Sequence, residues 1–236
     1  MSDIAVPLAA PRLDLLRALH ALRALLRDKE DTAKVFEIMR ALNGGATVKG
    51  YHRLLRTPEG STLAAARTEM APILDDDATM AQFAPGTVGA SYFAWKRAEG
   101  LSAEGLAEVS RSVNGAAKPG DDNPYAWFGR RTRDIHDLWH VLSGYGRDGL
   151  GEASLVAFSF AQTGGLGWGF IAMGATVQAL KRGEFGAIRA IIEGWRRGRH
   201  AAWLQGQDYR HVLGEDLEAA RQRLRIRPAR AYPIPA

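Results

Sequence analysis

The sequence predicts an all-α protein, a single-domain bundle of many helices with one long helix near its centre. Three observations favour this class. Leucines recur at the spacing of a helix face, Pro, Asn and Gly residues mark helix starts and ends, and no run alternates strictly enough to predict a strand. The chain has 236 residues, 46% hydrophobic and 24% charged, so it can bury a substantial core. We expect one domain over residues 1–236, with flexible ends at 1–10 and 227–236.

The first half of the chain contains five segments with helical signals. Leucines line one face of residues 12–28, and the preceding Pro11 is typical of a helix start. A second helix, Thr32–Leu42, is ended by the sequence Asn43-Gly44-Gly45. The other three predicted helices are Ser61–Met70, with Ser61 or Thr62 as its N-cap, Thr87–Arg97 and Ser102–Val113.

The second half opens with the strongest helix start in the sequence. Asn123 is a good N-cap and Pro124 is suited to the first helical position, so a long helix is predicted from there through about Leu142. Four further helices are predicted, followed by a proline-rich tail: Glu152–Gln162, Phe170–Lys181, Phe185–Gly194 and Asp208–Leu224.

Residues 153–180 include no charged side chain, and a segment of this length could span a bilayer. Polar residues interrupt the segment, and the cluster Gly164-Gly165-Leu166-Gly167 would break a spanning helix near its middle. We therefore favour two buried helices, or a helical hairpin, over a transmembrane span.

Cysteine is absent from the sequence. This excludes disulfides, thiolate zinc sites, iron–sulfur clusters and a catalytic thiol. Any metal must be held by histidine, carboxylate, backbone or water. The N-terminus has neither a secretory signal nor a transit-peptide composition, which fits a bacterial cytosolic chain.

The formal net charge of +5 comes from the C-terminal part of the chain. Twelve basic and six acidic residues follow from Lys181 onward, so the preceding part is nearly neutral. A basic region can meet nucleic acid, anionic lipid or an acidic partner. No nucleic-acid-binding motif accompanies it, so we expect no nucleic-acid partner and regard a solvated helix face as the simpler interpretation.

The segment with the clearest chemistry is His136-Asp137-Leu138-Trp139-His140. On a helix, the two histidines lie one turn apart on one face, and Asp137 can reach the same point. Glu152 would open the next helix after a glycine-rich reversal. Two imidazoles and carboxylates without sulfur suit zinc, cobalt, manganese or ferrous iron. The sequence thus places a candidate metal site on the long central helix.

This segment also allows interpretations other than a metal site of this kind. A histidine pair at this spacing also occurs by coincidence on helix surfaces. The segment resembles the HExxH motif of zinc proteases, but Asp137 is one methylene shorter than their glutamate base. The run Gly144–Gly149 matches GxGxxG literally, yet it follows a helix rather than a strand, so we reject a dinucleotide site.

At these residues the sequence resembles the Coq4 family of ubiquinone (coenzyme Q) biosynthesis proteins. The family hallmark is HDxxH followed after eleven residues by Glu, here His136 to Glu152. Pro85-Gly86-Thr87 with Gly89 and Tyr92, the dipeptide Arg133-Asp134, and residues 158–162 also match. The resemblance covers residues 36–226, and the absence of a mitochondrial presequence is typical of a bacterial member.

The resemblance implies a metal-binding protein that acts on polyprenylated benzenoid precursors, with oxidative decarboxylation at ring carbon C1. The residues it implies as metal ligands and catalytic groups are His136, Asp137, His140 and Glu152. Zinc is the metal we expect in the isolated protein, with cobalt, manganese or iron as alternatives. Zinc has no redox change with which to activate dioxygen, so either another metal is native or the ring reacts with oxygen directly. It also implies association with other ubiquinone biosynthesis proteins and peripheral attachment to the inner face of the bacterial plasma membrane. We further expect a homo-oligomer.

Further residues are candidates for substrate binding. Arg130, Arg131 and Arg133 could hold a carboxylate, and Gln162 is a fourth candidate contact, although helix-surface arginines are usually just solvated. The uncharged residues 153–180 could line a prenyl-binding wall or simply form core. The first helix could lie in an anionic bilayer through its leucines and arginines, or pack on the core, which we favour slightly.

Two other functions stay open beside the enzyme. A non-catalytic scaffold could present prenyl lipids to other enzymes around a structural metal. A metallohydrolase is weaker, because no general base is evident beyond the ligands themselves.

Overall fold

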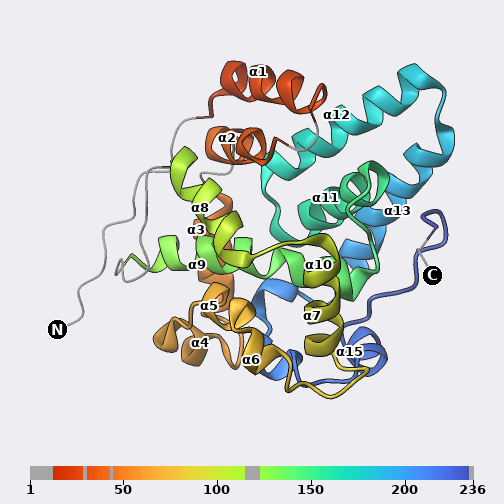
Figure 1. Cartoon of the computed structure of the whole chain (residues 1–236). Helices are drawn as coiled ribbons and strands as arrows, with labels where there is room; N and C mark the ends of the chain where they lie inside the picture. The colour runs from red at the N-terminus through yellow and green to blue at the C-terminus, as the bar shows by residue number, and fades with distance from the viewer. Residues whose placement is uncertain (1–12, 29–30, 43–44, 115–122, 234–236) are drawn as a thin grey trace.

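The computed structural model describes residues 13–28, 31–42, 45–114 and 123–233, and helices joined by loops and turns make up these ranges (Figure 1). Within them there is no strand, only an isolated antiparallel bridge between Thr87 and Asp216. The predicted all-α class is confirmed.

The described ranges contain fifteen α-helices and one short 3-10 helix. In chain order they are α1 (Leu15–Leu25), α2 (Thr32–Leu42), α3 (Ala46–Leu54), α4 (Gly60–Ala66), α5 (Ala71–Asp75), α6 (Asp77–Met80), α7 (Val88–Glu99), α8 (Ala103–Asn114), α9 (Pro124–Asp134), α10 (His136–Ser143), α11 (Gly149–Thr163), α12 (Leu166–Arg182), α13 (Phe185–His200), η1 (Leu204–Gly206), α14 (Tyr209–Val212) and α15 (Leu217–Arg223).

The predicted long central helix is two helices. Asn123 caps α9 as expected, with its side-chain oxygen accepting from the backbone N–H groups of residues 125 and 126. At Ile135, however, the backbone reaches ψ −7° and the buried side chain enters the core, and α10 starts at the next residue. Three of the four candidate ligands, His136, Asp137 and His140, therefore lie on an eight-residue helix rather than on a long one.

Tertiary contacts also divide the predicted helix Asp208–Leu224. The loop between α14 and α15 forms backbone hydrogen bonds with the segment that starts α7: Gly89 N–H donates to the Leu213 carbonyl (2.8 Å) and Val88 N–H to the Glu215 carbonyl (2.9 Å). Backbone groups used in this way cannot continue a helix. The predicted helix Ser61–Met70 is shortened to α4, which begins at Gly60 without a side-chain cap. Helices α3, α5 and α6 were not predicted.

The uncharged segment forms the predicted hairpin, with α11 and α12 separated by Gly164 and Gly165. Among the described helices, none combines the length and apolar character that crossing a bilayer requires. Helix α13 packs closely on α11 because Gly194 has no side chain: a Cβ there would lie 2.3 Å from the Ser154 carbonyl oxygen.

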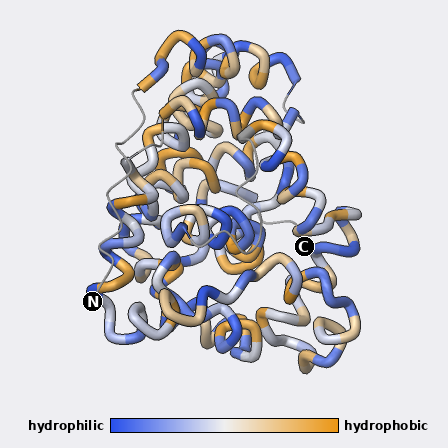
Figure 2. Tube along the Cα trace, turned by 90° about the vertical axis from the view of Figure 1, so that its left-hand side faces the viewer, coloured by the Kyte–Doolittle hydropathy of each residue, from blue (hydrophilic) through white to orange (hydrophobic). Residues whose placement is uncertain are grey.

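Two large hydrophobic clusters hold the described residues together. One surrounds the buried face of α10, including Leu138, Trp139 and Leu142, and joins it to α7, α11 and α15. The other joins α1 and α2 to α11 and α12. Hydrophobic and hydrophilic residues alternate along the individual helices in Figure 2, as expected for amphipathic segments.

Of the two predicted flexible ends, only the C-terminal one falls partly within the described residues. Residues 1–10 lie outside the described ranges. Residues 227–233, expected to be flexible, pack on the core: Tyr232 is only 3% exposed and hydrogen-bonds to Gly146 and Asp148. Proline content alone does not reveal this, because the contacts involve residues more than 80 positions away.

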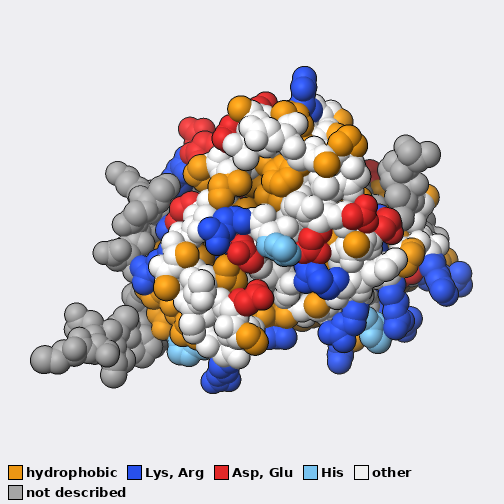
Figure 3. Space-filling model, turned by 90° about the horizontal axis from the view of Figure 1, so that it is seen from below, with side chains coloured by type: hydrophobic (Ala, Val, Ile, Leu, Met, Phe, Trp, Pro, Cys, Tyr) orange, Lys and Arg blue, Asp and Glu red, His pale blue; other side chains and the backbone are white. Residues whose placement is uncertain are grey.

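The basic C-terminal region does not form an unbroken positive surface. Arg223 pairs with Glu215, Arg221 with Glu218 and Arg210 with Asp208. On the face shown in Figure 3, basic and acidic side chains are interspersed.

Candidate metal centre

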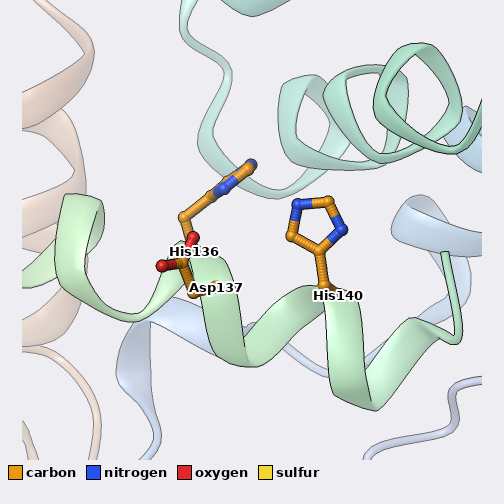
Figure 4. A group of neighbouring side chains, drawn as sticks. All are labelled: His136, Asp137 and His140. Carbon is orange, nitrogen blue, oxygen red and sulfur yellow. The ribbon is translucent and has the colours of Figure 1, made fainter. Parts of the chain in front are cut away.

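Three of the four predicted ligands form one cluster on α10. His136, Asp137 and His140 each offer a donor atom, and these atoms lie within 4.8 Å of one another. Figure 4 shows both imidazoles extending from the helix towards the neighbouring elements. A zinc–nitrogen bond is about 2.1 Å, so two ligand atoms of a tetrahedral zinc ion lie about 3.4 Å apart. The donor atoms, which lie up to 4.8 Å apart, would therefore have to move closer together to share a zinc ion.

The hydrogen bonds of the two histidines suit metal ligation. Nδ1 of His140 lies 2.9 Å from the backbone carbonyl oxygen of Tyr145. A carbonyl only accepts, so Nδ1 carries the proton and Nε2 keeps its lone pair. Nε2 of His136 is buried and has no hydrogen-bond partner. A buried polar atom without a partner is costly, and an ion would satisfy it.

Two tryptophans hold the imidazole rings in place. The Trp168 ring stacks on His136 with centroids 4.9 Å apart and planes 10° from parallel. The Trp95 ring stacks on His140 at 5.3 Å and 23°. The two imidazoles themselves meet edge to face at 5.5 Å. Stacking restricts the rotation of both rings, so the site is preorganised.

Burial sets the protonation of the cluster. It lowers the pKa of His136 to about 3, with the nearby His140 adding to the effect, and it lowers the pKa of His140 to about 4. Burial also raises the pKa of Asp137 to about 7, a shift that Arg147 opposes. At neutral pH both imidazoles are therefore neutral, the form that binds metals.

The fourth predicted ligand, Glu152, is in the first turn of α11 and faces the same cluster. Its Oε1 lies 3.6 Å from His140 Nε2, the atom that Tyr145 leaves available. Arg147 Nε stands 3.8 Å from the same oxygen, and Arg147 Nη1 lies 3.6 Å from Glu99. Glu152 is thus placed beside the cluster but is not part of the three-residue group.

The cluster opens into a cavity of about 1160 Å³, larger than the range of about 300–1000 Å³ typical of small-molecule pockets. All four predicted ligands line it, together with Trp168. Much of the remaining wall is apolar and comes from α1, α2, α12 and α13: Leu25, Leu26, Val35, Phe36, Met39, Ile171, Ala175 and Ile191. Part of the uncharged segment thus lines the cavity, and part of it is core.

The four predicted substrate contacts divide into two groups. Arg130 and Arg133 line the cavity. Arg130 pairs with Glu69 at 2.7 Å but leaves Nη1 buried without a hydrogen-bond partner, whereas Arg133 pairs with Asp134 at 2.6 Å.

Arg131 and Gln162 do not line the cavity. Arg131 donates to the Gln207 carbonyl. The Gln162 side chain bonds to the backbone at residues 198, 202 and 204, which fixes the end of α13 on α11. Both side chains, which the sequence offered as substrate contacts, instead form hydrogen bonds with the backbone of the protein itself.

Sequence reasoning missed Trp95, Trp168 and Arg147. Trp95 follows the Pro85–Tyr92 motif by one helical turn, and Tyr92 packs on it with ring centroids 6.0 Å apart. That motif was the available signal for Trp95. Arg147 lies in the glycine-rich reversal, whose glycines indicate a sharp backbone turn and carry no signal for the contacts of the arginine side chain.

The sequence matches, over residues 6–230, the family described as "Coenzyme Q (ubiquinone) biosynthesis protein Coq4". The chain belongs to the Coq4 family. Among the Coq4 relatives, the ubiquinone biosynthesis protein coq4, mitochondrial, of Pyrenophora tritici-repentis is 29% identical over 191 residues, or 78% of this chain and 63% of that protein. A Coq4 homologue of Danio rerio is 31% identical over 117 residues, covering 50% of this chain and 40% of the relative. The chain thus spans less than two thirds of the length of these relatives.

The fold is also known from a crystal structure. A candidate ubiquinone biosynthesis protein of Nostoc punctiforme PCC 73102 superposes with a TM-score of 0.66 and 22% identity, covering 90% of this chain and 98% of that one. At this identity the similarity shows a shared fold.

Proposed function

We propose that this chain is a metal-dependent enzyme of ubiquinone biosynthesis that removes the C1 carboxyl group of a polyprenylated benzoate and leaves a hydroxyl group. The observation that carries the proposal is the cluster of His136, Asp137 and His140 at a cavity with long apolar walls. A benzenoid head would bind at the cluster and its prenyl tail along the apolar side chains. The Coq4 family description supports the pathway.

A divalent ion bound there would supply Lewis acidity, which stabilises negative charge on the ring as carbon dioxide departs. His136 and His140 would hold the ion as neutral donors, with Asp137 and Glu152 as carboxylate ligands. Arg130, with its unpaired Nη1, is our candidate for the substrate carboxylate. The overall change is a two-electron oxidation of the ring: the bond from C1 to the carboxyl group breaks, carbon dioxide leaves, water supplies the hydroxyl oxygen, and dioxygen accepts two electrons and two protons to become hydrogen peroxide.

Turnover by the purified protein tests the proposal. With an added divalent metal, the chain should convert a prenylated hydroxybenzoate to the hydroxylated, decarboxylated product. His140→Ala should abolish the reaction, while His211→Ala, which removes an exposed histidine, should retain it. Full turnover by His140→Ala would refute the role of the cluster.

A non-catalytic, lipid-presenting scaffold is the alternative that the same cavity allows. It would bind the prenylated ligand and partner proteins without product formation. A closed shell of four protein ligands favours this structural role, whereas an open coordination position favours catalysis. Association with other biosynthesis proteins and homo-oligomerisation stay predictions.

We place the predicted peripheral contact with the inner face of the plasma membrane on helices α1 and α12, which pack together where Leu22 approaches Gly174. Both expose apolar side chains, for example Leu16 (75% exposed) and Met173 (55%), and both have basic residues in their last turns. The combination suits an anionic lipid surface.

Flotation with vesicles containing anionic lipid tests this placement. The double variant Leu16→Gln, Met173→Gln should float less than the wild type. Leu55→Gln, which changes a leucine 43% exposed at the end of α3, is the matched control and should float normally. Equal flotation of all three proteins would reject this surface.

A further inference from the structure

The C-terminal end of α10 is held by side chains from distant helices. The last four carbonyls of any helix lack partners within it. In α10, the carbonyls of residues 140–143 all accept hydrogen bonds. Gly144 N–H donates to the carbonyl of residue 140 (2.8 Å). The Arg221 side chain donates to the carbonyls of residues 141 (2.9 Å) and 142 (3.0 Å), and the Arg197 side chain donates to that of residue 143 (2.7 Å). Gly144 itself has φ +76°, which allows the turn that follows. The end of the ligand-bearing helix therefore has a defined position.

The loop after α10 is held by Tyr232, near the end of the described chain. The Tyr232 ring packs edge-on against Tyr145, with centroids 5.3 Å apart, and Tyr145 supplies the carbonyl that orients His140. The Tyr232 hydroxyl accepts from Gly146 N–H (3.0 Å) and donates to the carboxylate of Asp148.

Asp148 connects this loop to the second ligand-bearing helix. Its other oxygen caps α11 by accepting from the N–H groups of Leu150 (3.0 Å) and Gly151 (3.1 Å), immediately before Glu152. A single hydroxyl thus joins the loop that orients His140 to the cap of the helix that carries Glu152.

The segment that carries Tyr232 is fixed in turn by α13. The Glu193 carboxylate accepts from the N–H groups of Arg230 and Ala231, and Arg197 Nε donates to the Arg227 carbonyl (2.7 Å). Figure 1 shows this last, dark blue part of the chain running beside α13 towards the C-terminus. Tyr232 therefore reaches the loop from an anchored backbone.

We propose that Tyr232 is a positioning residue of the metal centre, which sets the distance between His140 Nε2 and the Glu152 carboxylate through Tyr145, Gly146 and Asp148. This inference rests on the proposed metal centre. Residues behind the direct ligands commonly change metal affinity by about 10–100-fold when they are replaced.

The test is Co²⁺ binding by Tyr232→Phe, a change that keeps the ring and removes only the hydroxyl. We expect the Kd for Co²⁺ to rise about tenfold and the visible absorption spectrum of bound Co²⁺ to change. A second variant, Asp148→Asn, keeps a good N-cap while weakening the acceptor for the Tyr232 hydroxyl, so its Kd should rise in the same direction. The spectrum reports ligand geometry, which a loss of stability alone does not change.

Tyr209→Phe is the matched control. It removes an equally buried tyrosine hydroxyl that bonds α10 through Trp139 Nε1 (2.7 Å) without touching the loop. Its Kd and spectrum should match the wild type. The positioning role is rejected if Tyr232→Phe binds Co²⁺ like the wild type, or if Tyr209→Phe loses as much affinity. Retention of Co²⁺ by His140→Ala would instead reject the metal centre, and the positioning role with it.

Discussion

Metal uptake by the purified chain should weaken with falling pH as one proton competes for the site. In the metal-free protein, burial raises the pKa of Asp137 to about 7, so its carboxyl group is protonated below that pH. The pKa values of His136, about 3, and His140, about 4, leave both imidazoles neutral above pH 5. One competing proton lowers the apparent association constant about tenfold per pH unit below 7. Two histidines with ordinary pKa values near 6.5 would make the fall steeper.

The sign of the shift also predicts how the metal-free fold responds to pH. The folded pKa of Asp137 lies above its ordinary value near 3.9. This carboxyl group therefore contributes stability that is fully present below about pH 3.9 and is lost as the pH rises from there to about 7.

A competition titration of Zn²⁺ against a chromophoric chelator, from pH 5.5 to 8, measures this dependence. The logarithm of the association constant should rise with a slope near one below pH 7 and level off above it. Asp137→Asn should bind more weakly, with little pH dependence in this range. A slope of two or more in the wild type, or an unchanged slope in Asp137→Asn, would refute the assignment.

Three further variants test the packing and the site. Gly194→Ala should lower the free energy of unfolding by about 1–3 kcal/mol in urea titrations, because the added Cβ meets the Ser154 carbonyl at 2.3 Å; wild-type stability would contradict the close approach of α13 and α11. Glu152→Gln should raise the Kd for Zn²⁺ about tenfold or more if the carboxylate is a ligand, and an unchanged Kd would exclude it. Trp168→Ala removes the ring stacked on His136, so the affinity for Zn²⁺ should fall severalfold. A wild-type binding enthalpy and Kd, measured by calorimetry, would contradict a role for Trp168 in metal binding.

Much of the helical structure could be predicted because its signals are local. Asn123 caps α9, and Thr32–Leu42 has the predicted bounds, since a capping side chain and a periodic apolar face act within a few residues. The predicted helix boundaries were wrong where contacts with distant residues determine the end of a helix. Ile135 ends α9 and enters the core, and the loop before α15 bonds to the start of α7.

The sequence by itself determined the helical class and the cluster of His136, Asp137 and His140, because helix periodicity places these residues on one side within two turns. Only the tertiary structure decided what surrounds them: the tryptophans on each imidazole, the cavity, and the contacts of Tyr232. The physical reason is separation along the chain. Local periodicity carries no information about which side chains meet after folding, and the partners that orient this site come from five different helices and the C-terminal segment.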